Sequence, residues 1–259
     1  MAAAGSLAFP VVAADAGVTR RMFDNGYGTG QSVIDGLLRA TNILLAGKTV
    51  VVAGYGPCGA AIAERAAGLG AQVIVTEVDR VRALDALMRG YRLLPMAQAA
   101  PLGDVFITAT GSRDVIIDSH FELMRDQAVL ANAGHFDVEI DVRGLARLAV
   151  EVNMQVRPHA DEYVLGNGRR LILLAEGRVV NLIAAEGNPA AVMDLSFAAQ
   201  ALALQWLASG QADLGAGVHP MPGWIDAQVA GLTLAALGAR IDELTCAQEE
   251  YLASWHEGS

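Results

Sequence analysis

Cysteine is scarce in this sequence, and its scarcity limits the kinds of site that the chain can build. Of 259 residues only Cys58 and Cys246 are cysteines, and they lie far apart without a nearby histidine. A disulfide framework and a structural zinc site both need more ligands than these two residues supply. We therefore expect no metal site, and we expect both thiols to be buried as small apolar side chains.

Basic residues are also few, with 18 Lys and Arg against 28 Asp and Glu and a net charge of −10. This charge argues against sequence-independent binding to nucleic acid or to anionic membranes. The sequence has no unbroken run of about eighteen apolar residues, and its first residues lack the basic leading region of a signal peptide. We expect a cytoplasmic protein whose partner is a small molecule, with no nucleic acid and no membrane.

Short β-branched runs alternate with helix-like segments from Lys48 onward. The runs are TVVVA, QVIVTE, DVFITAT, QAVLANAG and VEVNMQV, and GNG between two later apolar runs indicates a hairpin. Strands that alternate with helices predict an α/β fold, a doubly wound and mostly parallel sheet. We divide the chain into an N-terminal arm at 1–44, the α/β domain at 45–185 and a C-terminal helical segment at 186–259.

The C-terminal segment has the pattern of two helices. One runs from Pro189 to Ser209, with proline at its start and Gly210 at its stop, and a second lies around Ile225 to Leu237. Apolar positions cover more than one face of the first helix, which favours burial between subunits of a dimer or tetramer. An ordinary core helix is the alternative.

A glycine-rich signature follows the first of the buried runs. The letters GYGPCG, residues 54–59, come after TVVVA and open a helix, and Glu77 ends the next predicted strand. This order is the G-x-G-x-x-G fingerprint of a Rossmann-type dinucleotide site. An acidic residue at Glu77 suits a ribose diol and opposes a 2′-phosphate, so NAD is preferred to NADP. The alternative is a glycine-rich turn that holds no ligand.

Six strings carry a resemblance that covers nearly the whole chain, from about Phe9 to Leu252. They are FDNGYGTGQSVIDG, AGKTVVVAGYGPCG, ITATGS, NAGHFDVEID, GNGRRLILLAEGRVVNL and PAAVMDLSFAAQAL. In this order they resemble the S-adenosylhomocysteine hydrolase family. The resemblance implies a tightly held NAD that oxidises the 3′-hydroxyl of an adenine nucleoside. The ketone acidifies the 4′-hydrogen, a group leaves the 5′ carbon, and the hydride returns.

The same resemblance implies roles for individual residues. Asp24 and Asn25 match a sugar-contacting pair, and together with Arg20 and His135 they are the candidate catalytic residues. Asn188 and Met193 are the candidate substrate residues. The candidate cofactor residues are Gly54, Gly56, Pro57, Cys58, Gly59, Glu77, Thr110, Gly134, His135 and Asn181.

Departures from the family pattern fall on the substrate side. Only twenty-two residues precede Phe23, where the family carries most of its substrate domain, so either the nucleoside site is built differently or a partner chain completes it. Arg20 replaces a lysine, and a guanidinium stays charged where an amine can exchange a proton. Asn188 replaces a histidine and cannot shuttle a proton at neutral pH.

Three functions are compatible with these observations. The first is an NAD-dependent enzyme that oxidises an adenine nucleoside and eliminates water or a related group at the 5′ carbon, as in nucleoside tailoring. The second is an adenosylhomocysteinase, which converts S-adenosylhomocysteine to adenosine and homocysteine, here as a shortened enzyme or as part of a split one. The third is a noncatalytic NAD-binding regulatory subunit.

Overall fold

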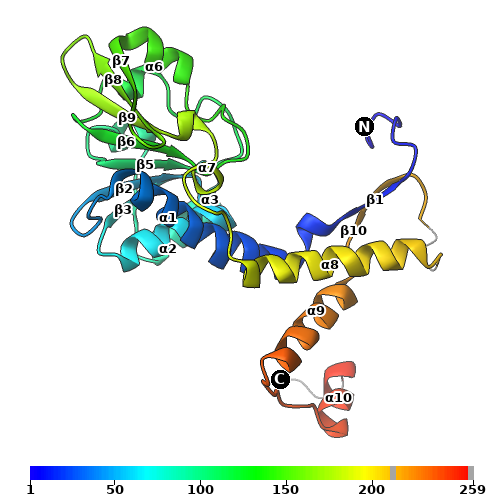
Figure 1. Cartoon of the computed structure of the whole chain (residues 1–259). Helices are drawn as coiled ribbons and strands as arrows, with labels where there is room; N and C mark the ends of the chain where they lie inside the picture. Colours follow the sequence, from blue (N-terminus) through cyan, green and yellow to red (C-terminus); the bar gives the residue numbers. More distant parts are fainter. Residues whose placement is uncertain (211–213, 256–259) are drawn as a thin grey trace.

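An eight-stranded sheet forms the centre of the larger part of the molecule (Figure 1). The computed structural model describes residues 1–210 and 214–255. The strand order is β4-β3-β2-β5-β6-β9-β8-β7; pairing is parallel from β4 to β9, and β8 and β7 are antiparallel. The strands are β2 Thr49–Ala53, β3 Gln72–Thr76, β4 Arg92–Leu93, β5 Val105–Thr108, β6 Ala128–Asn132, β7 Ala149–Arg157, β8 Ala160–Leu165 and β9 Arg170–Leu174. This arrangement confirms the predicted fold class, and β8 and β9 form the predicted hairpin.

Helices cover both faces of the sheet, because the central strands bury side chains on both sides. In β2, Val50 and Val52 point into one apolar cluster and Val51 into the other, as the alternation of a strand requires. The first cluster includes side chains from α1, α2, α3 and α7, and the second includes side chains from α4, α5 and α6. These helices are α1 Gly30–Thr41, α2 Pro57–Gly68, α3 Arg80–Met88, α4 Met96–Ala99, α5 Asp118–Phe121, α6 Val142–Leu148 and α7 Val180–Ile183, with a short 3-10 turn η3 Ala175–Gly177 before α7.

Helix α1 packs on the sheet domain. Its Val33, Ile34 and Leu37 are buried in the first cluster, and the helix ends at Asn42, which has the left-handed backbone of a C-cap. A π-helical segment, η2 Arg20–Thr29, runs directly into α1. The segment that carries Asp24 is therefore anchored to the domain that carries the glycine loop. The division of the chain at 44/45 and 185/186 stays a prediction.

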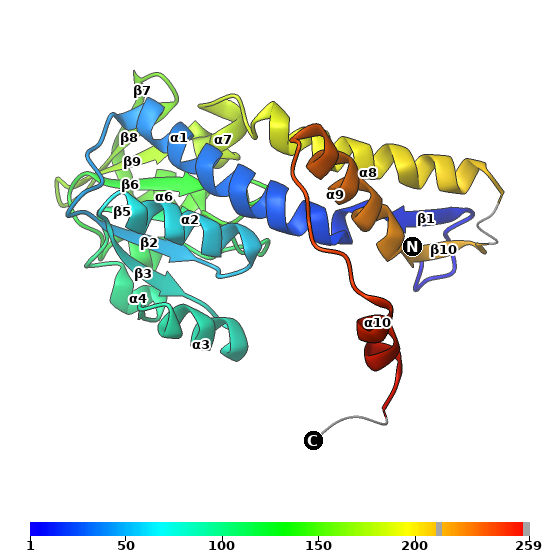
Figure 2. The same ribbon diagram turned by 90° about the horizontal axis from the view of Figure 1, so that it is seen from below.

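The rest of the chain forms an arm that projects from the sheet domain (Figures 1 and 2). It contains β1 Pro10–Ala13, η1 Ala14–Ala16, α8 Ala190–Ala208, β10 Gly217–Pro220 and α9 Gly223–Ala236, with α10 Cys246–Ala253 beyond it. Strands β1 and β10 pair in parallel, and α8 packs against α9 through a small cluster that includes Leu195 and Ile225. The two predicted helices are confirmed, although Pro189 caps α8 and is not its first helical residue. Residues 211–213 and 256–259 of the predicted C-terminal segment lie outside this description.

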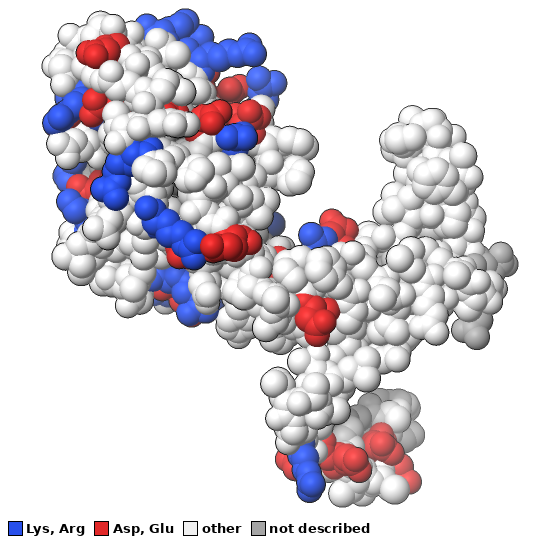
Figure 3. Space-filling model, viewed as in Figure 1, with Lys and Arg blue, Asp and Glu red and all other residues white. Residues whose placement is uncertain are grey.

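Helix α8 is long and exposes apolar side chains on the arm. By length and composition it is the one described helix that could cross a membrane, a property that helices in the cores of globular proteins share. It lies against α9 and η2, yet Phe197 and Leu204 are more than half exposed. Figure 3 shows that charged side chains gather on the sheet domain and are sparse over this part of the arm. The expected burial of α8 between subunits stays a prediction, as does the absence of a membrane.

The expectation for the two cysteines is wrong for one of them. Cys58 is half-buried at the start of α2, whereas Cys246 is exposed. Cys246 begins α10, a helix with no buried residue in the described chain, so no apolar neighbours cover its thiol. Among the described residues, no group of three or more His, Cys, Asp or Glu is placed to hold a metal ion.

Candidate active site

Two adjoining cavities lie where β2, β3, β5 and β6 end. The first has a volume of about 700 Å³ and the second about 560 Å³. Both are lined by Gly56, Arg82, Ala109 and Thr110, so they form one groove that crosses the glycine-rich loop. The carboxyl ends of parallel strands are where open α/β sheets bind ligands.

The three glycines of the loop differ in what the surrounding protein demands of them. Gly54 has a φ of +92°, and a Cβ there would lie 2.7 Å from the carbonyl oxygen of Ala109. A Cβ on Gly59 would lie 2.0 Å from the carbonyl oxygen of Gly54, so only glycine lets α2 pack this close to the loop. At Gly56 the nearest atom would be 3.6 Å away. Because the protein has room there, the open space at Gly56 is free for a ligand phosphate.

Helix α2 presents its N-terminus to this space. Gly56 is the N-cap and Pro57 is the first helical residue, where the missing N–H of proline removes no intrahelical bond. The remaining N–H groups of the first turn have no partner inside the helix and attract anions. Burial raises the pKa of the Cys58 thiol in this turn, with a smaller opposing effect from its hydrogen bond with Thr29. The thiol therefore stays protonated and neutral near the phosphate position.

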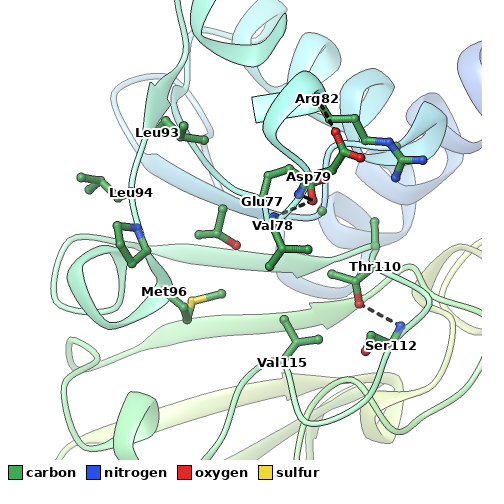
Figure 4. Close-up of a pocket in the computed structure, with 15 residues that line it drawn as sticks. Glu77, Val78, Asp79, Arg82, Leu93, Leu94, Met96, Thr110, Ser112 and Val115 are labelled. Carbon is green, nitrogen blue, oxygen red and sulfur yellow. Dashed lines mark hydrogen bonds between the residues drawn. The ribbon is translucent and has the colours of Figure 1, made fainter. Parts of the chain in front are cut away.

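Glu77 lies in the first cavity, immediately after β3 (Figure 4). Its carboxylate accepts hydrogen bonds from the backbone N–H groups of Tyr55 at 2.6 Å, Val78 at 2.6 Å and Asp79 at 2.9 Å. These bonds tie the carboxylate to the glycine loop on one side and to the start of α3 on the other. A carboxylate held in this way can accept hydrogen bonds from a ribose diol.

The other walls of the first cavity are mostly apolar. Figure 4 shows side chains from the β4 region and from the loop after β5 around the same space as Glu77. The apolar residues that line it are Val78, Leu93, Leu94, Pro95, Met96 and Val115. An apolar cavity next to a carboxylate suits an adenine ring joined to a ribose. The first cavity thus has the chemistry of an adenosine site.

We expect the affinity of the chain for NAD to persist in mildly acidic solution. Burial raises the pKa of the Glu77 carboxyl, but the N–H groups of Asp79, Tyr55 and Val78 lower it by more, so its pKa lies below the ordinary value. A lowered pKa keeps the carboxylate charged as the pH falls, and its contribution is lost only below the glutamate value of about 4.3. Calorimetric titration should give a nearly constant NAD affinity from about pH 7 to about pH 5.

The control for this pH prediction is Glu77→Gln. This variant should bind NAD more weakly than the native protein. Because glutamine does not titrate, its affinity should also lack the decrease below about pH 5 that Glu77 causes in the native protein. A loss of NAD affinity in the native protein that is centred above about pH 5 would contradict the lowered pKa of Glu77.

The second cavity brings together residues that are far apart in the sequence. Arg20, Asp24 and Asn25 come from η2, and His135 comes from the loop after β6. The predicted residues that line this cavity are Arg20, Asp24, Asn25, Gly56, Pro57, Cys58, Thr110, Gly134, His135, Asn181, Asn188 and Met193. Gly54 and Glu77 line the first cavity, and Gly59 lies beneath the loop and lines neither. The roles assigned to these residues stay predictions.

Asp24 is the centre of a polar cluster in the second cavity. Its carboxylate accepts a hydrogen bond from Ser196 Oγ at 3.0 Å and another from the side-chain amide of Asn188. Arg20 Nε lies 3.4 Å from Asp24 Oδ2. Asp24 is only 7% exposed, and charge-assisted hydrogen bonds of this kind hold a buried carboxylate in one orientation. The cluster joins η2, the start of α8 and the loop between α7 and α8.

The cluster continues to a polar atom that has no hydrogen-bond partner in the described part of the chain. Ser32 Oγ donates to Asn188 Oδ1 at 2.8 Å, and Asn181 Nδ2 donates to Ser32 Oγ at 3.0 Å. Asn181 Oδ1 is buried and has no hydrogen-bond partner among the described residues. Buried acceptors are nearly always satisfied, so this oxygen is available to a donor from outside the chain. A carboxamide such as that of nicotinamide carries such a donor.

The turn that carries His135 is fixed by Asn132, a residue that our sequence reasoning missed. Asn132 Nδ2 donates to the carbonyl groups of Gly134, Phe136 and Gly177 at 2.9–3.2 Å. Its Oδ1 accepts from the N–H of Gly134 at 2.7 Å. His135 itself is exposed and makes an edge contact with Phe136, with ring centroids 4.7 Å apart. Asn132 thus determines the backbone from which the imidazole projects.

Arg82 is a second residue that the sequence reasoning missed. It lies on α3, lines both cavities, and approaches Gly56 at the point where the cavities meet. A guanidinium at this position can donate to a diphosphate. Its spacing of five residues after Glu77, in the first turn of the next helix, was the available signal.

The groove fits NAD from end to end. Its first cavity offers a carboxylate and apolar walls, its middle offers the open space at Gly56 and a helix N-terminus, and its second cavity offers the unpaired oxygen of Asn181. Each of these features matches a different part of the dinucleotide.

A protein-family model agrees with this fit, and several known proteins are similar to this chain. A family model described as "S-adenosyl-L-homocysteine hydrolase, NAD binding domain" matches residues 25–187. Adenosylhomocysteinase from Thermosynechococcus vestitus is 54% identical over 98% of this chain and 59% of its own length. That from Saccharolobus solfataricus is 54% identical over 98% of this chain and 61% of its own length. A crystal structure of a glyoxylate reductase from Paecilomyes thermophila is similar at 19% identity and a TM-score of 0.40, over 49% of this chain and 44% of that one.

The chain spans about 60% of the length of these curated relatives. The matched family model covers the glycine loop, Glu77, His135 and Asn181, and its description names NAD. NAD is therefore the cofactor of the groove. The chain belongs to the S-adenosyl-L-homocysteine hydrolase family.

Proposed function

We propose that this chain oxidises the 3′-hydroxyl of an adenine nucleoside and that elimination at the 5′ carbon follows. NAD, when bound, supplies the acceptor that takes the hydride from C3′ and later returns it. The observation that carries the proposal is the cluster around Asp24, which lies in the same cavity as the unpaired oxygen of Asn181. This arrangement supports a role for a fixed carboxylate next to the nicotinamide end of the groove.

Asp24 would bind the sugar. Ser196 and Asn188 donate hydrogen bonds to its carboxylate, and Arg20 forms an ion pair with it, so the carboxylate is held in one orientation. It can accept a hydrogen bond from a sugar hydroxyl and hold that hydroxyl for oxidation. Asn25, the next residue on η2, lines the same cavity and offers both a donor and an acceptor to the sugar.

Proton transfer would fall to His135. Arg20 remains charged and Asn188 does not titrate, and both are engaged with Asp24. Among the described residues that line the second cavity, His135 is the only histidine, the side-chain type that gives and takes a proton near neutral pH. Once C3′ is a ketone, loss of the 4′-proton to a base and departure of the 5′ group with its electron pair leave a double bond between C4′ and C5′.

Two leaving groups are compatible with this site, and we favour water over homocysteine. The relatives named adenosylhomocysteinase support homocysteine as the group that leaves the 5′ carbon of S-adenosylhomocysteine. In that reaction water adds to the double bond and the returned hydride yields adenosine. Loss of water from a nucleoside is the second candidate, and the replacement of a lysine by Arg20 and of a histidine by Asn188 favours it.

An assay of NAD reduction and product mass tests the proposal. Purified protein with bound NAD should show absorbance of NADH when it is mixed with S-adenosylhomocysteine or with adenosine. Mass spectrometry then separates homocysteine release from a loss of 18 mass units. Asp24→Asn is the matched variant, and we expect it to bind NAD but to turn over at least about 100-fold more slowly.

The same assay distinguishes the proposed reaction from a split enzyme and from a noncatalytic subunit. Turnover that begins only when the amino-terminal part of a relative is added would support a split enzyme, whose second chain completes the nucleoside site. Bound NAD that no nucleoside reduces, with or without that addition, would overturn the proposed reaction and favour a noncatalytic NAD-binding subunit.

A further inference from the structure

Glu139 is a buried carboxylate behind the wall of the second cavity. It lies seven residues after the end of β6 and is 1% exposed. Its Oε2 accepts from the N–H of Thr110 at 2.9 Å and from Thr110 Oγ1 at 2.7 Å, and its Oε1 accepts from the N–H of Gly111 at 2.8 Å. Three donors therefore face this carboxylate, and no cation among the described residues pairs with it.

The carboxylate also lies directly against the loop after β6. A Cβ built on Gly134 would be only 1.9 Å from Glu139 Oε1. Thr110, Gly111 and Gly134 all line the second cavity. One layer of backbone thus separates the negative charge of Glu139 from the space that the nicotinamide half of NAD would occupy.

No ion pair balances this charge within the described part of the chain. Asp24, a carboxylate that lines the second cavity, is paired with Arg20. Among the described residues, Glu139 takes part in no salt bridge, and its carboxylate receives hydrogen bonds only from Thr110 and Gly111. A buried charge without a counter-ion is costly. A positive charge brought close by a ligand would offset part of that cost.

We propose that Glu139 makes the groove prefer NAD⁺ to NADH. NADH differs from NAD⁺ by a hydride added at C4 of the nicotinamide ring, so only the oxidised ring carries a positive charge. The field of a buried carboxylate acts on that charge through a poorly screened wall. The first cavity has the chemistry for adenosine, so the ring lies in the second cavity, next to Glu139. The inference rests on NAD as the cofactor and is independent of the proposed reaction.

A preference of this kind has a chemical consequence. If NAD⁺ is bound more tightly than NADH, the reduced form on the protein is a stronger hydride donor than free NADH. A cofactor that must return its hydride to the same substrate benefits from that bias. Glu139 is a positioning residue for Thr110 and Gly111 as well, so the test must separate its charge from its hydrogen bonds.

The test compares the affinities of the two cofactor forms by calorimetry, with any copurifying dinucleotide removed first. In Glu139→Gln, the ratio of the NADH dissociation constant to that of NAD⁺ should fall about fivefold. Glu139→Asp keeps the charge and should leave the ratio within about twofold, even if both forms bind more weakly. Glu77→Gln alters a carboxylate at the adenosine end, so it should weaken both forms equally.

Equal weakening of NAD⁺ and NADH in Glu139→Gln would overturn the proposal, because a purely structural role predicts that result. Circular dichroism shows whether the variant is folded. If the variant is unfolded, the affinities of the native protein for NAD⁺ and for NADH are compared instead. Tighter binding of NAD⁺ than of NADH supports the role of Glu139, and NADH binding that is as tight or tighter overturns it.

Discussion

Gly59→Ala should abolish tight NAD binding and strongly destabilise the chain. The added methyl group would lie 2.0 Å from the carbonyl oxygen of Gly54, and neither partner is a flexible side chain that can move away. Relief requires that α2 shift away from the glycine loop, which disrupts the N-terminus that faces the phosphates. We expect a loss of about 3 kcal/mol in the free energy of unfolding and NAD binding weaker by at least about 100-fold.

Two other glycines provide controls for this prediction. Gly68 ends the same helix with no atom within 4 Å of an added Cβ, so Gly68→Ala should leave NAD binding unchanged and be neutral or slightly stabilising. Gly56→Ala should cost less than about 1 kcal/mol of stability, yet weaken NAD binding about tenfold because the methyl group occupies the phosphate position. Urea unfolding and calorimetry measure both quantities. Native-like NAD binding by Gly59→Ala would contradict the close packing of loop and helix.

Asn132→Ala should give the second large loss of stability. Asn132 is fully buried, and truncation removes its bonds to three carbonyl groups, to the N–H of Gly134 and to the hydroxyl of Thr108, which donates to Asn132 Oδ1 at 3.0 Å. These partners would be left without a bond in a buried place, at a cost of about 4 kcal/mol in the free energy of unfolding. Chemical denaturation followed by circular dichroism checks this value.

The control for Asn132 is an asparagine at the edge of the sheet. Asn153 on β7 makes one side-chain hydrogen bond, to Glu162 at 3.2 Å, and Asn153→Ala should cost less than about 1 kcal/mol. Asn132→Ala should also weaken NAD binding, because the turn at Gly134 forms part of the second cavity. The importance of Asn132 would be refuted if the two variants lost similar amounts of stability.

The parts of the fold that depend on local pattern could be predicted from the sequence. Buried strands read as β-branched runs, and the loop at residues 54–59 carries glycines at positions where a positive φ or a close contact excludes a side chain. Glu77 was recognisable as well, because it ends the next β-branched run after the glycine loop. Those features depend on neighbours in the sequence, so a single segment reveals them.

Other residues of the site could not be recognised in this way. Asn132 and Glu139 are hidden in a string that draws attention to His135, yet each braces a loop by contacts with other segments. The sequence predicted that the segment before the first strand of the sheet belongs to an N-terminal arm. In the structure, the apolar face of helix α1 in this segment packs in the same cluster as Val50 and Val52 of β2. The pairing of β1 with β10 joins residues about 200 positions apart and has no local signal.

The sequence alone determined the α/β class, the dinucleotide groove and the preference for NAD, because glycine geometry and the charge of Glu77 act within short segments. Only the tertiary structure decided that Arg20 and Asn188 both bind Asp24. It also decided that an oxygen of Asn181 has no partner among the described residues and that the buried carboxylate of Glu139 lies behind Gly134. Such facts depend on distances between segments that meet only when the sheet and its helices pack. The physical reason is that hydrogen bonds and charges act over a few ångströms of space, whatever the separation along the chain.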